Sequence, residues 1–165
     1  MSFFAKSVSP VPSLQPISLD RIAEVLTSED INFGFSDDRE RLGGYWGEHL
    51  VEFILYGQTS EVLQVRAHWG RPLEVARWSE MLERVNANNS ERIWPKIYVD
   101  RDDEVLAVMA EHSIDYEHGA TDAQIMQHVQ CAISTSLSAF ERLDEAYPEA
   151  VAAWHAAHPD WDSGE

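Results

Sequence analysis

Cysteine is almost absent from this sequence, in which Cys131 is the only one. A single thiol allows no disulfide within the chain, and this usage is typical of a reducing compartment. Long apolar runs are absent as well. The segment before Lys6 is too short for the core of a signal peptide, and no later segment approaches the length of a membrane span. We therefore predict a cytoplasmic protein without a membrane partner.

Basic residues are scarce relative to acidic ones. Lys and Arg together number 12 against 29 Asp and Glu, which gives a formal net charge of -17. Such a charge repels phosphate backbones, whose binding depends on clusters of Lys and Arg. We predict no direct contact with nucleic acid. The acidic excess serves either solubility or the binding of a basic partner, and composition alone leaves both open.

The motifs of common catalytic sites are absent too. The chain has no G-x-S-x-G, no G-x-x-x-x-G-K-[ST], no H-E-x-x-H and no glycine pattern for a dinucleotide. Cys131 is the one nucleophile of note, but its place in an apolar helical stretch is typical of a thiol that packs as a small hydrophobe. We predict a protein that is not an enzyme, with no catalytic residues and no cofactor.

One short segment concentrates possible metal ligands. Residues 111–118 (EHSIDYEH) hold imidazole and carboxylate groups, and His112, Asp115 and His118 are the candidates for a zinc or iron site. Spacings of three in a strand or loop do not make side chains converge, however, and a polar strand end at a solvated edge explains the same residues. We favour the edge, predict no metal and keep the metal site as the alternative.

Apolar periodicity predicts one α+β domain over residues 18–148, preceded by a flexible, proline-containing leader over residues 1–17. Hairpin loops are expected between the strands, among them an acidic tip at residues 100–103. Runs of strands broken by single helices indicate an antiparallel sheet with the helices gathered on one face. Strands are expected where apolar and polar residues alternate, at residues 31–35, 42–46, 50–56, 62–69, 97–99 and 105–109.

Helices are expected at residues 19–29, at 72–89 and from 121 onward. Ser18 caps the first of them. The second helix turns Trp78 and Leu82 toward the sheet, because these positions continue its apolar face. The third begins at Thr121, which can form a capping box with Gln124.

Residues 149–165 are expected to form a short helix followed by an acidic, disordered tail. Trp154 in this segment has little core to join, so we assign its ring to a contact with a partner. Because the segment lacks a long apolar run, we expect its removal to leave the domain folded.

The third helix lacks charge on its outer face. Residues 123–140 contain no Asp, Glu, Lys or Arg, although 25% of the chain is charged. A helix on a sheet normally carries charge on the face turned to solvent. Gln127, Cys131, Ser134 and Ser138 form one stripe there, and small neutral side chains let a second backbone approach closely. We predict that this stripe is a protein interface and the contact of a homodimer; a polar solvated face is the alternative.

A series of short motifs extends over most of the chain: residues 44–46 (GYW), 63–69 (LQVRAHW), 82–86 (LERVN), 94–99 (WPKIYV), 110–112 (AEH), 115–124 (DYEHGATDAQ) and 136–140 (SLSAF). In this order and spacing they resemble the actinobacterial branch of the YbjN family, over about residues 18–148. The resemblance implies a fold similar to that of type III secretion chaperones, a curved antiparallel sheet with helices packed on it, often paired. It also implies regulation of sensory transduction, or adaptor or chaperone work, without established catalytic residues.

Two functions from different classes follow from the sequence. The first is a non-catalytic, cytoplasmic, regulatory or chaperone-like domain that binds a protein partner of unidentified nature and acts as a homodimer. The second is a metal-binding sensor or metal-dependent enzyme centred on His112, Asp115 and His118. Metal content and the identity of co-purifying proteins would separate them.

Overall fold

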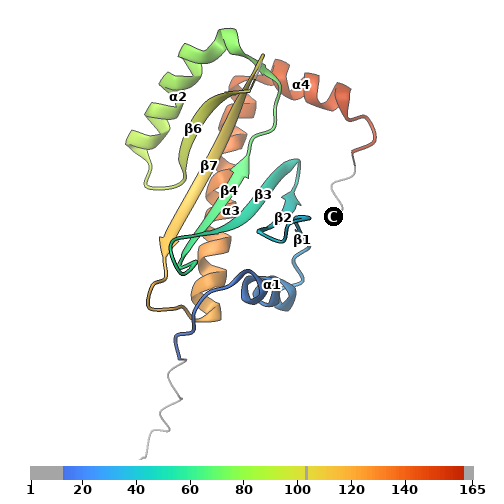
Figure 1. The fold of residues 1–165 in the computed structure, drawn as a ribbon. Helices are drawn as coiled ribbons and strands as arrows, with labels where there is room; N and C mark the ends of the chain where they lie inside the picture. The colour runs from blue at the N-terminus through green and yellow to red at the C-terminus, as the bar shows by residue number, and fades with distance from the viewer. Residues whose placement is uncertain (1–12, 103, 162–165) are drawn as a thin grey trace, which may run out of the picture.

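The computed structural model describes residues 13–102 and 104–161, which form one antiparallel sheet and a layer of helices (Figure 1). Within these residues the sheet has seven strands in the order β1-β2-β3-β4-β7, with β5 and β6 both paired to β7. The strands are β1 (Gly34–Phe35), β2 (Arg41–Trp46), β3 (His49–Tyr56), β4 (Val62–His68), β5 (Leu73–Glu74), β6 (Lys96–Asp102) and β7 (Val105–Asp115). The helices are α1 (Leu19–Ser28), the 3-10 turn η1 (Val75–Arg77), α2 (Trp78–Glu91), α3 (Asp122–Ala146) and α4 (Pro148–Ala157). The expected α+β class is confirmed.

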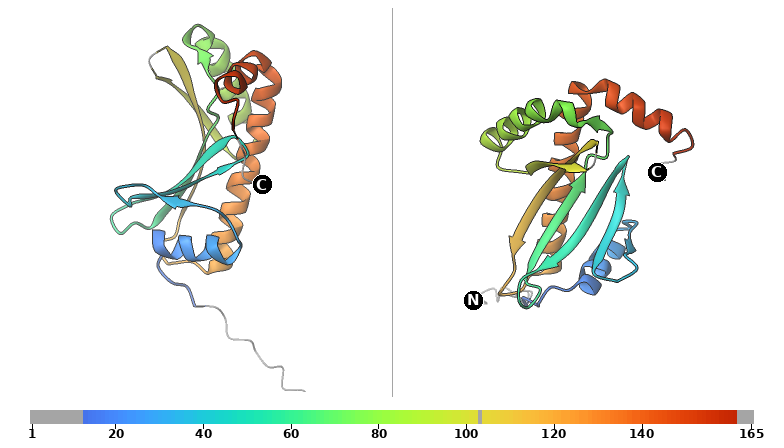
Figure 2. Two further views of the ribbon diagram at one scale, coloured as in Figure 1. Left: turned by 90° about the vertical axis from the view of Figure 1, so that its right-hand side faces the viewer. Right: turned by 45° about the horizontal axis from the view of Figure 1, so that its top comes forward.

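The helices cover the sheet from one side. α3 runs along one face, α2 and α4 lie on the same side, and in the described chain no helix lies against the opposite face (Figure 2). Along β4, Leu63, Val65 and Ala67 are buried, while Gln64 and Arg66 between them stay partly exposed. Successive side chains of a strand point to opposite faces, so the core lies between the sheet and α3.

The uncovered face of the sheet carries a polar network. Arg66 on β4 is opposite Glu111 on β7, and its Nε donates to Glu111 Oε1 at 2.8 Å. The Tyr98 hydroxyl donates to the same carboxylate oxygen at 2.6 Å, and burial, with the neighbouring Glu111, raises the pKa of Tyr98. On the next pair of strands, His68 Nε2 lies 2.8 Å from Glu52 Oε2. This face is therefore solvated and internally hydrogen-bonded.

α2 covers part of the outer edge of β6, beside which it lies in Figure 1. Asn89 Nδ2 donates to the Ile97 carbonyl at 2.8 Å, and Asn89 Oδ1 accepts from the Ile97 N–H at 2.9 Å. A bare edge strand presents unpaired backbone groups that invite pairing with another chain. Because Asn89 bonds both the N–H and the carbonyl of Ile97, these two backbone groups are not available to another strand.

Three expectations about α2 are wrong. The helix begins at Trp78 because residues 73–74 are held against β7 as β5, and it runs past residues 86–89 to Glu91. Its buried residues are Met81 and Val85, whereas Leu82 is 41% exposed. Met81 and Val85 are four residues apart and share the inward face, whereas Leu82 is turned by about 100° from Met81.

The strand predictions hold with different lengths. The segment expected at residues 31–35 forms only the two-residue β1. β6 and β7 are longer than expected, and β6 continues into the predicted acidic tip as far as Asp102. Asp103 lies outside the described residues.

Residues 13–17, which are the described part of the leader expected over residues 1–17, contact the domain. Residues 1–12 lie outside the described range, but Gln15 pairs with Ala120 through N–H···O bonds of 3.1 and 2.9 Å. Ile17 is buried. The predicted cap is confirmed, since Ser18 Oγ accepts from the Arg21 N–H at 3.1 Å.

Arg71 joins α4 to the rest of the fold. Its Nη2 donates to Glu48 at 2.6 Å and to Asp144 on α3 at 3.0 Å. Trp69 Nε1 donates to the same Asp144 carboxylate at 2.7 Å. The guanidinium lies 4.8 Å from the centre of the Trp154 ring, a cation–π contact. We call Arg71, Glu48, Asp144, Trp69 and Trp154 the Arg71 network.

The burial of Trp154 corrects two expectations about the C-terminal segment. Its side chain is 6% exposed, so it joins the fold and does not offer its ring to a partner. Trp161 lies beside it, with ring centres 5.4 Å apart, and 4.9 Å from the ring of Tyr45. The part of the expected disordered tail that is described is therefore packed, and residues 162–165 lie outside the described range.

Candidate protein-interaction surface

The uncharged stripe of the sequence lies on the outer face of α3. Gln127, Ser134 and Ser138 are exposed and Cys131 is partly exposed. The opposite face is buried, through Ile125, Met126, His128, Val129, Ala132, Ile133, Ser136, Ala139, Phe140 and Leu143. The capping box of Thr121 and Gln124 that starts the helix is present. As for the helices as a whole, none within the described residues combines the length and the apolar composition that a membrane span requires.

Exposed apolar side chains adjoin this stripe. Cys131 Sγ lies 3.9 Å from Nε2 of His112, and the ring of Trp94 packs against that of His112, with centres 4.5 Å apart and planes tilted by 43°. Trp94 is 47% exposed, and Ile93 before it is 75% exposed. We call Gln127, Cys131, Ser134 and Ser138, together with Ile93 and Trp94, the α3 surface. Aromatic and aliphatic side chains beside small neutral ones are typical of a protein interface.

Under the α3 surface, two buried histidines pack against each other. The rings of His112 and His128 lie 4.6 Å apart, and His128 Nε2 is 3.3 Å from the His112 carbonyl oxygen. Burial lowers the pKa of His112. Burial first, and the charge of His112 second, lower the pKa of His128 to about 4. Both imidazoles are therefore neutral at pH 7 and pack as core side chains.

The structure separates the residues expected in the alternative metal site. His112 is buried under α3, whereas the side chain of His118 is 84% exposed and pairs with Glu117. Asp115 is exposed, and being three residues from His112 on β7 it points to the other face. In the chain apart from residues 1–12, 103 and 162–165, no three His, Cys, Asp or Glu side chains gather to hold a metal ion. The metal site is not formed.

Cys131 lies beside a buried imidazole. A thiolate is stabilised by a nearby positive charge, such as a protonated histidine. The imidazole beside Cys131 is His112, whose pKa is lowered by burial. The role of Cys131 as a packing residue stays a prediction.

One polar residue of this region escaped the sequence reasoning. Arg142 follows Ser138 by one helical turn, so the spacing that defines the stripe continues to it. Its Nη1 donates to Ser138 Oγ at 3.0 Å, and its Nη2 donates to Asn88 Oδ1 on α2 at 3.2 Å. The predicted stripe ends before Glu141, where charged residues begin again, and therefore omits Arg142.

The fold and the surface define a class of protein: an α+β domain whose helices cover one face of an open antiparallel sheet and whose long helix turns an uncharged stripe outward. The family model named YbjN, described as "Putative bacterial sensory transduction regulator", matches residues 18–145. The chain therefore belongs to the YbjN family, and the resemblance to this family that its motifs indicate is confirmed.

The search of solved structures supports the fold. The chain is similar to a structure titled "Crystal structure of YbjN, a putative transcription regulator from E. coli", with a TM-score of 0.69 and 16% identity. The match covers 82% of this chain and 96% of that chain. At this identity the likeness shows the shared fold alone. The search of curated proteins finds no match.

Proposed function

We propose that this protein is a non-catalytic regulatory domain that acts in the cytoplasm by binding protein, and that the α3 surface is the contact between two copies of the chain. The observation that carries the proposal is the uncharged outer stripe of α3 beside the exposed side chains of Ile93 and Trp94. Membership of a regulator family supports a role in control. The single Cys131 supports a reducing compartment.

Charge favours this face for self-association. Two copies with a formal net charge of -17 each repel one another, so the least costly contact lies where charge is absent. Residues 123–140 carry none. In a two-fold dimer the same patch meets itself, and Ser134 and Ser138 are small enough for two helices to approach closely.

Ser134→Glu tests the proposal. The variant places a negative charge next to its own copy across the two-fold axis, where like charges repel. We expect a lower dimer fraction with unchanged helix content, because Glu is a good helix former and the position is exposed. Sedimentation of wild type and variant over a concentration series measures this.

Ser79→Glu is the matched control, since Ser79 is an exposed serine on α2, away from the stripe, and the net charge changes by the same amount. It should leave the dimer fraction unchanged. A wild type that is monomeric at every concentration, or an S134E variant that dimerises as well as the wild type, would contradict the proposal and return the stripe to solvent.

A further inference from the structure

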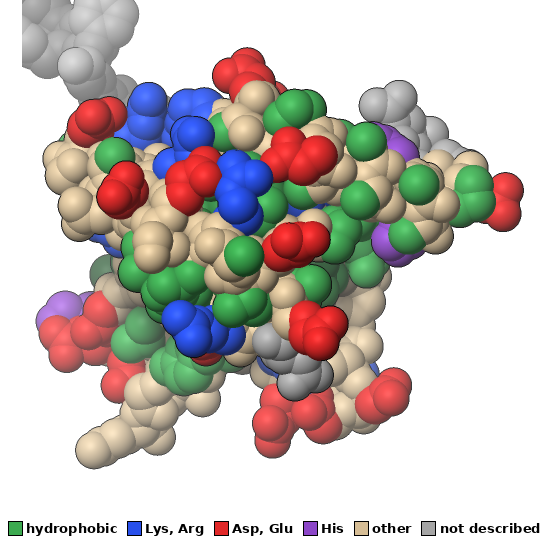
Figure 3. All heavy atoms as spheres, turned by 90° about the horizontal axis from the view of Figure 1, so that it is seen from above, with side chains coloured by type: hydrophobic (Ala, Val, Ile, Leu, Met, Phe, Trp, Pro, Cys, Tyr) green, Lys and Arg blue, Asp and Glu red, His purple; other side chains and the backbone are tan. Residues whose placement is uncertain are grey.

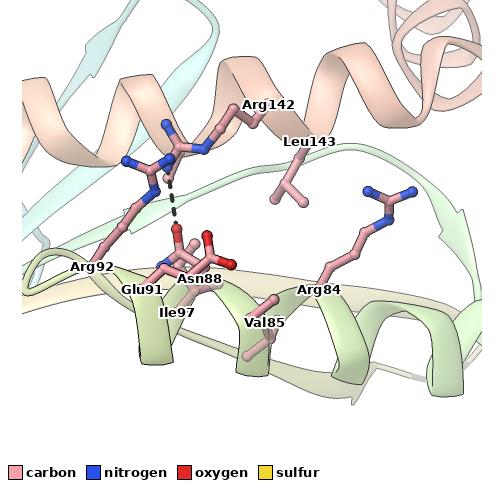
Figure 4. Close-up of a pocket in the computed structure, with 10 residues that line it drawn as sticks. Arg84, Val85, Asn88, Glu91, Arg92, Ile97, Arg142 and Leu143 are labelled. Atoms are coloured by element: carbon pink, nitrogen blue, oxygen red, sulfur yellow. Dashed lines mark hydrogen bonds between the residues drawn. The ribbon is translucent and has the colours of Figure 1, made fainter.

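A groove between α2 and α3 combines an apolar floor with a basic rim. Its floor is made by Val85, Ile97, Ala139 and Leu143, all at most 8% exposed, and the cavity has a volume of about 260 Å³. Arg84, Arg92 and Arg142 also line it, with Asn88 and Glu91 between them. Figure 4 shows these side chains, with Arg92 and Arg142 turned toward one another and Arg84 directed away.

Among the described residues, Arg92 and Arg142 lack the carboxylate partner that most arginines of the chain have. Seven other arginines pair with Asp or Glu within 4 Å, as Arg66 does with Glu111. Among the described residues, neither Arg92 nor Arg142 has such a partner; Arg142 donates only to the neutral Ser138 and Asn88. Glu91 lines the same groove without an ion pair. In Figure 3, several Lys and Arg side chains lie near one another on the upper surface, with Asp and Glu side chains among them.

The guanidinium groups of Arg92 and Arg142 repel each other electrostatically. Burial first, and the charge of Arg92 second, lower the pKa of Arg142, while Glu141 and Glu145 partly offset this. A guanidinium nevertheless stays protonated in proteins. Two like charges thus share a groove that Glu91 also lines, although in the described chain the Glu91 carboxylate pairs with neither of them. A bound oxyanion would satisfy both forks of donors and remove the repulsion.

We propose that this groove binds a small organic oxyanion, a carboxylate or phosphate group carried on a short apolar body. Arg92 and Arg142 hold the oxyanion, and the body lies on Val85, Ile97 and Leu143. The cavity volume of about 260 Å³ lies just below the usual range for small-molecule sites, so the ligand is small. A polyanion such as nucleic acid is disfavoured by the net charge of -17. The site does not depend on the proposed dimer.

Calorimetric titration with three probes that share a phenyl ring tests the site: benzoate, phenyl phosphate and uncharged benzyl alcohol. We expect one or both anions to bind the wild type and to raise its melting temperature, and benzyl alcohol to do neither. Binding of benzoate alone assigns the site to carboxylates, and binding of phenyl phosphate alone assigns it to phosphates. The double variant Arg92→Gln, Arg142→Gln should bind at least about tenfold more weakly, because charge-assisted hydrogen bonds are lost.

Arg39→Gln is the control, since Arg39 is exposed, pairs with Asp20 and lies outside the groove. It should bind the anions as the wild type does. Arg92→Gln alone changes an exposed side chain and should fold normally, so weaker binding in this variant separates loss of the site from loss of the fold. Absence of binding by every anion, or equal binding by the wild type and the double variant, would overturn the proposal.

Discussion

Arg71 lies beside the C-terminal half of α3 and Arg142 is part of it, but the surroundings of the two side chains are opposites. Arg71 is 4% exposed and donates to Glu48 and Asp144 at 2.6 and 3.0 Å. Arg142 is partly exposed, donates to the neutral Ser138 and Asn88, and shares its groove with Arg92. One arginine is surrounded by carboxylates and the other is beside a second cation.

The difference separates an arginine that holds the fold from one that is free to hold a ligand. The carboxylates around Arg71 come from the β2–β3 turn and from α3, and its cation–π partner Trp154 comes from α4, so three distant segments depend on it. Arg142 joins α3 to α2 through one hydrogen bond to Asn88. Stability should therefore respond strongly to Arg71 and weakly to Arg142.

Arg71→Met should have the largest effect. Methionine keeps most of the apolar stem but leaves Glu48 and Asp144 without their partner, and breaking a buried pair in this way costs about 3 kcal/mol of unfolding free energy. Urea denaturation measures the loss. Arg39→Met, which breaks the exposed pair with Asp20, should change stability by less than about 1 kcal/mol. Equal stability of the two variants would show that the Arg71 network does not hold the fold.

Trp154→Ala should come next. Removing a nearly buried tryptophan costs about 3 kcal/mol, and it also deprives Arg71 of its ring partner. Thermal unfolding should show a lower melting temperature, and deletion of residues 149–165 should lower it too, in contrast to the sequence-based expectation. Trp94→Ala is the comparison, with a smaller loss because its ring is 47% exposed. A tail deletion that melts like the wild type would place α4 outside the cooperative unit.

Arg142→Gln without ligand should have the smallest effect. The variant keeps a hydrogen-bonding side chain and removes repulsion from Arg92, so we expect a change within about 0.5 kcal/mol in either direction. Urea denaturation of this variant and of Arg71→Met under the same conditions compares their losses of unfolding free energy directly. A loss as large as that of Arg71→Met would show that Arg142 is a structural residue.

The contrast between the two arginines was not visible in the sequence. Both occur singly in ordinary contexts, and the carboxylates that neutralise Arg71 lie 23 and 73 residues away. Trp154 was assigned to a partner for the same reason, since its own segment is polar and the residues that bury it belong to other elements. The residues of the alternative metal site do not come together for a local reason: an odd spacing along β7 places His112 and Asp115 on opposite faces of the sheet.

Short-range chemistry by itself determined the elements of this protein. The cap of α1 is formed by Ser18 and that of α3 by Thr121 with Gln124, through hydrogen bonds between residues three positions apart. The uncharged outer stripe of α3 follows from helical spacing. Tertiary structure alone decided the start of α2, which awaited the pairing of β5 with β7, and the burial of Trp154. It also decided which arginines meet carboxylates, because electrostatic partners are chosen by distance in space, and a folded chain brings together charges that its sequence keeps apart.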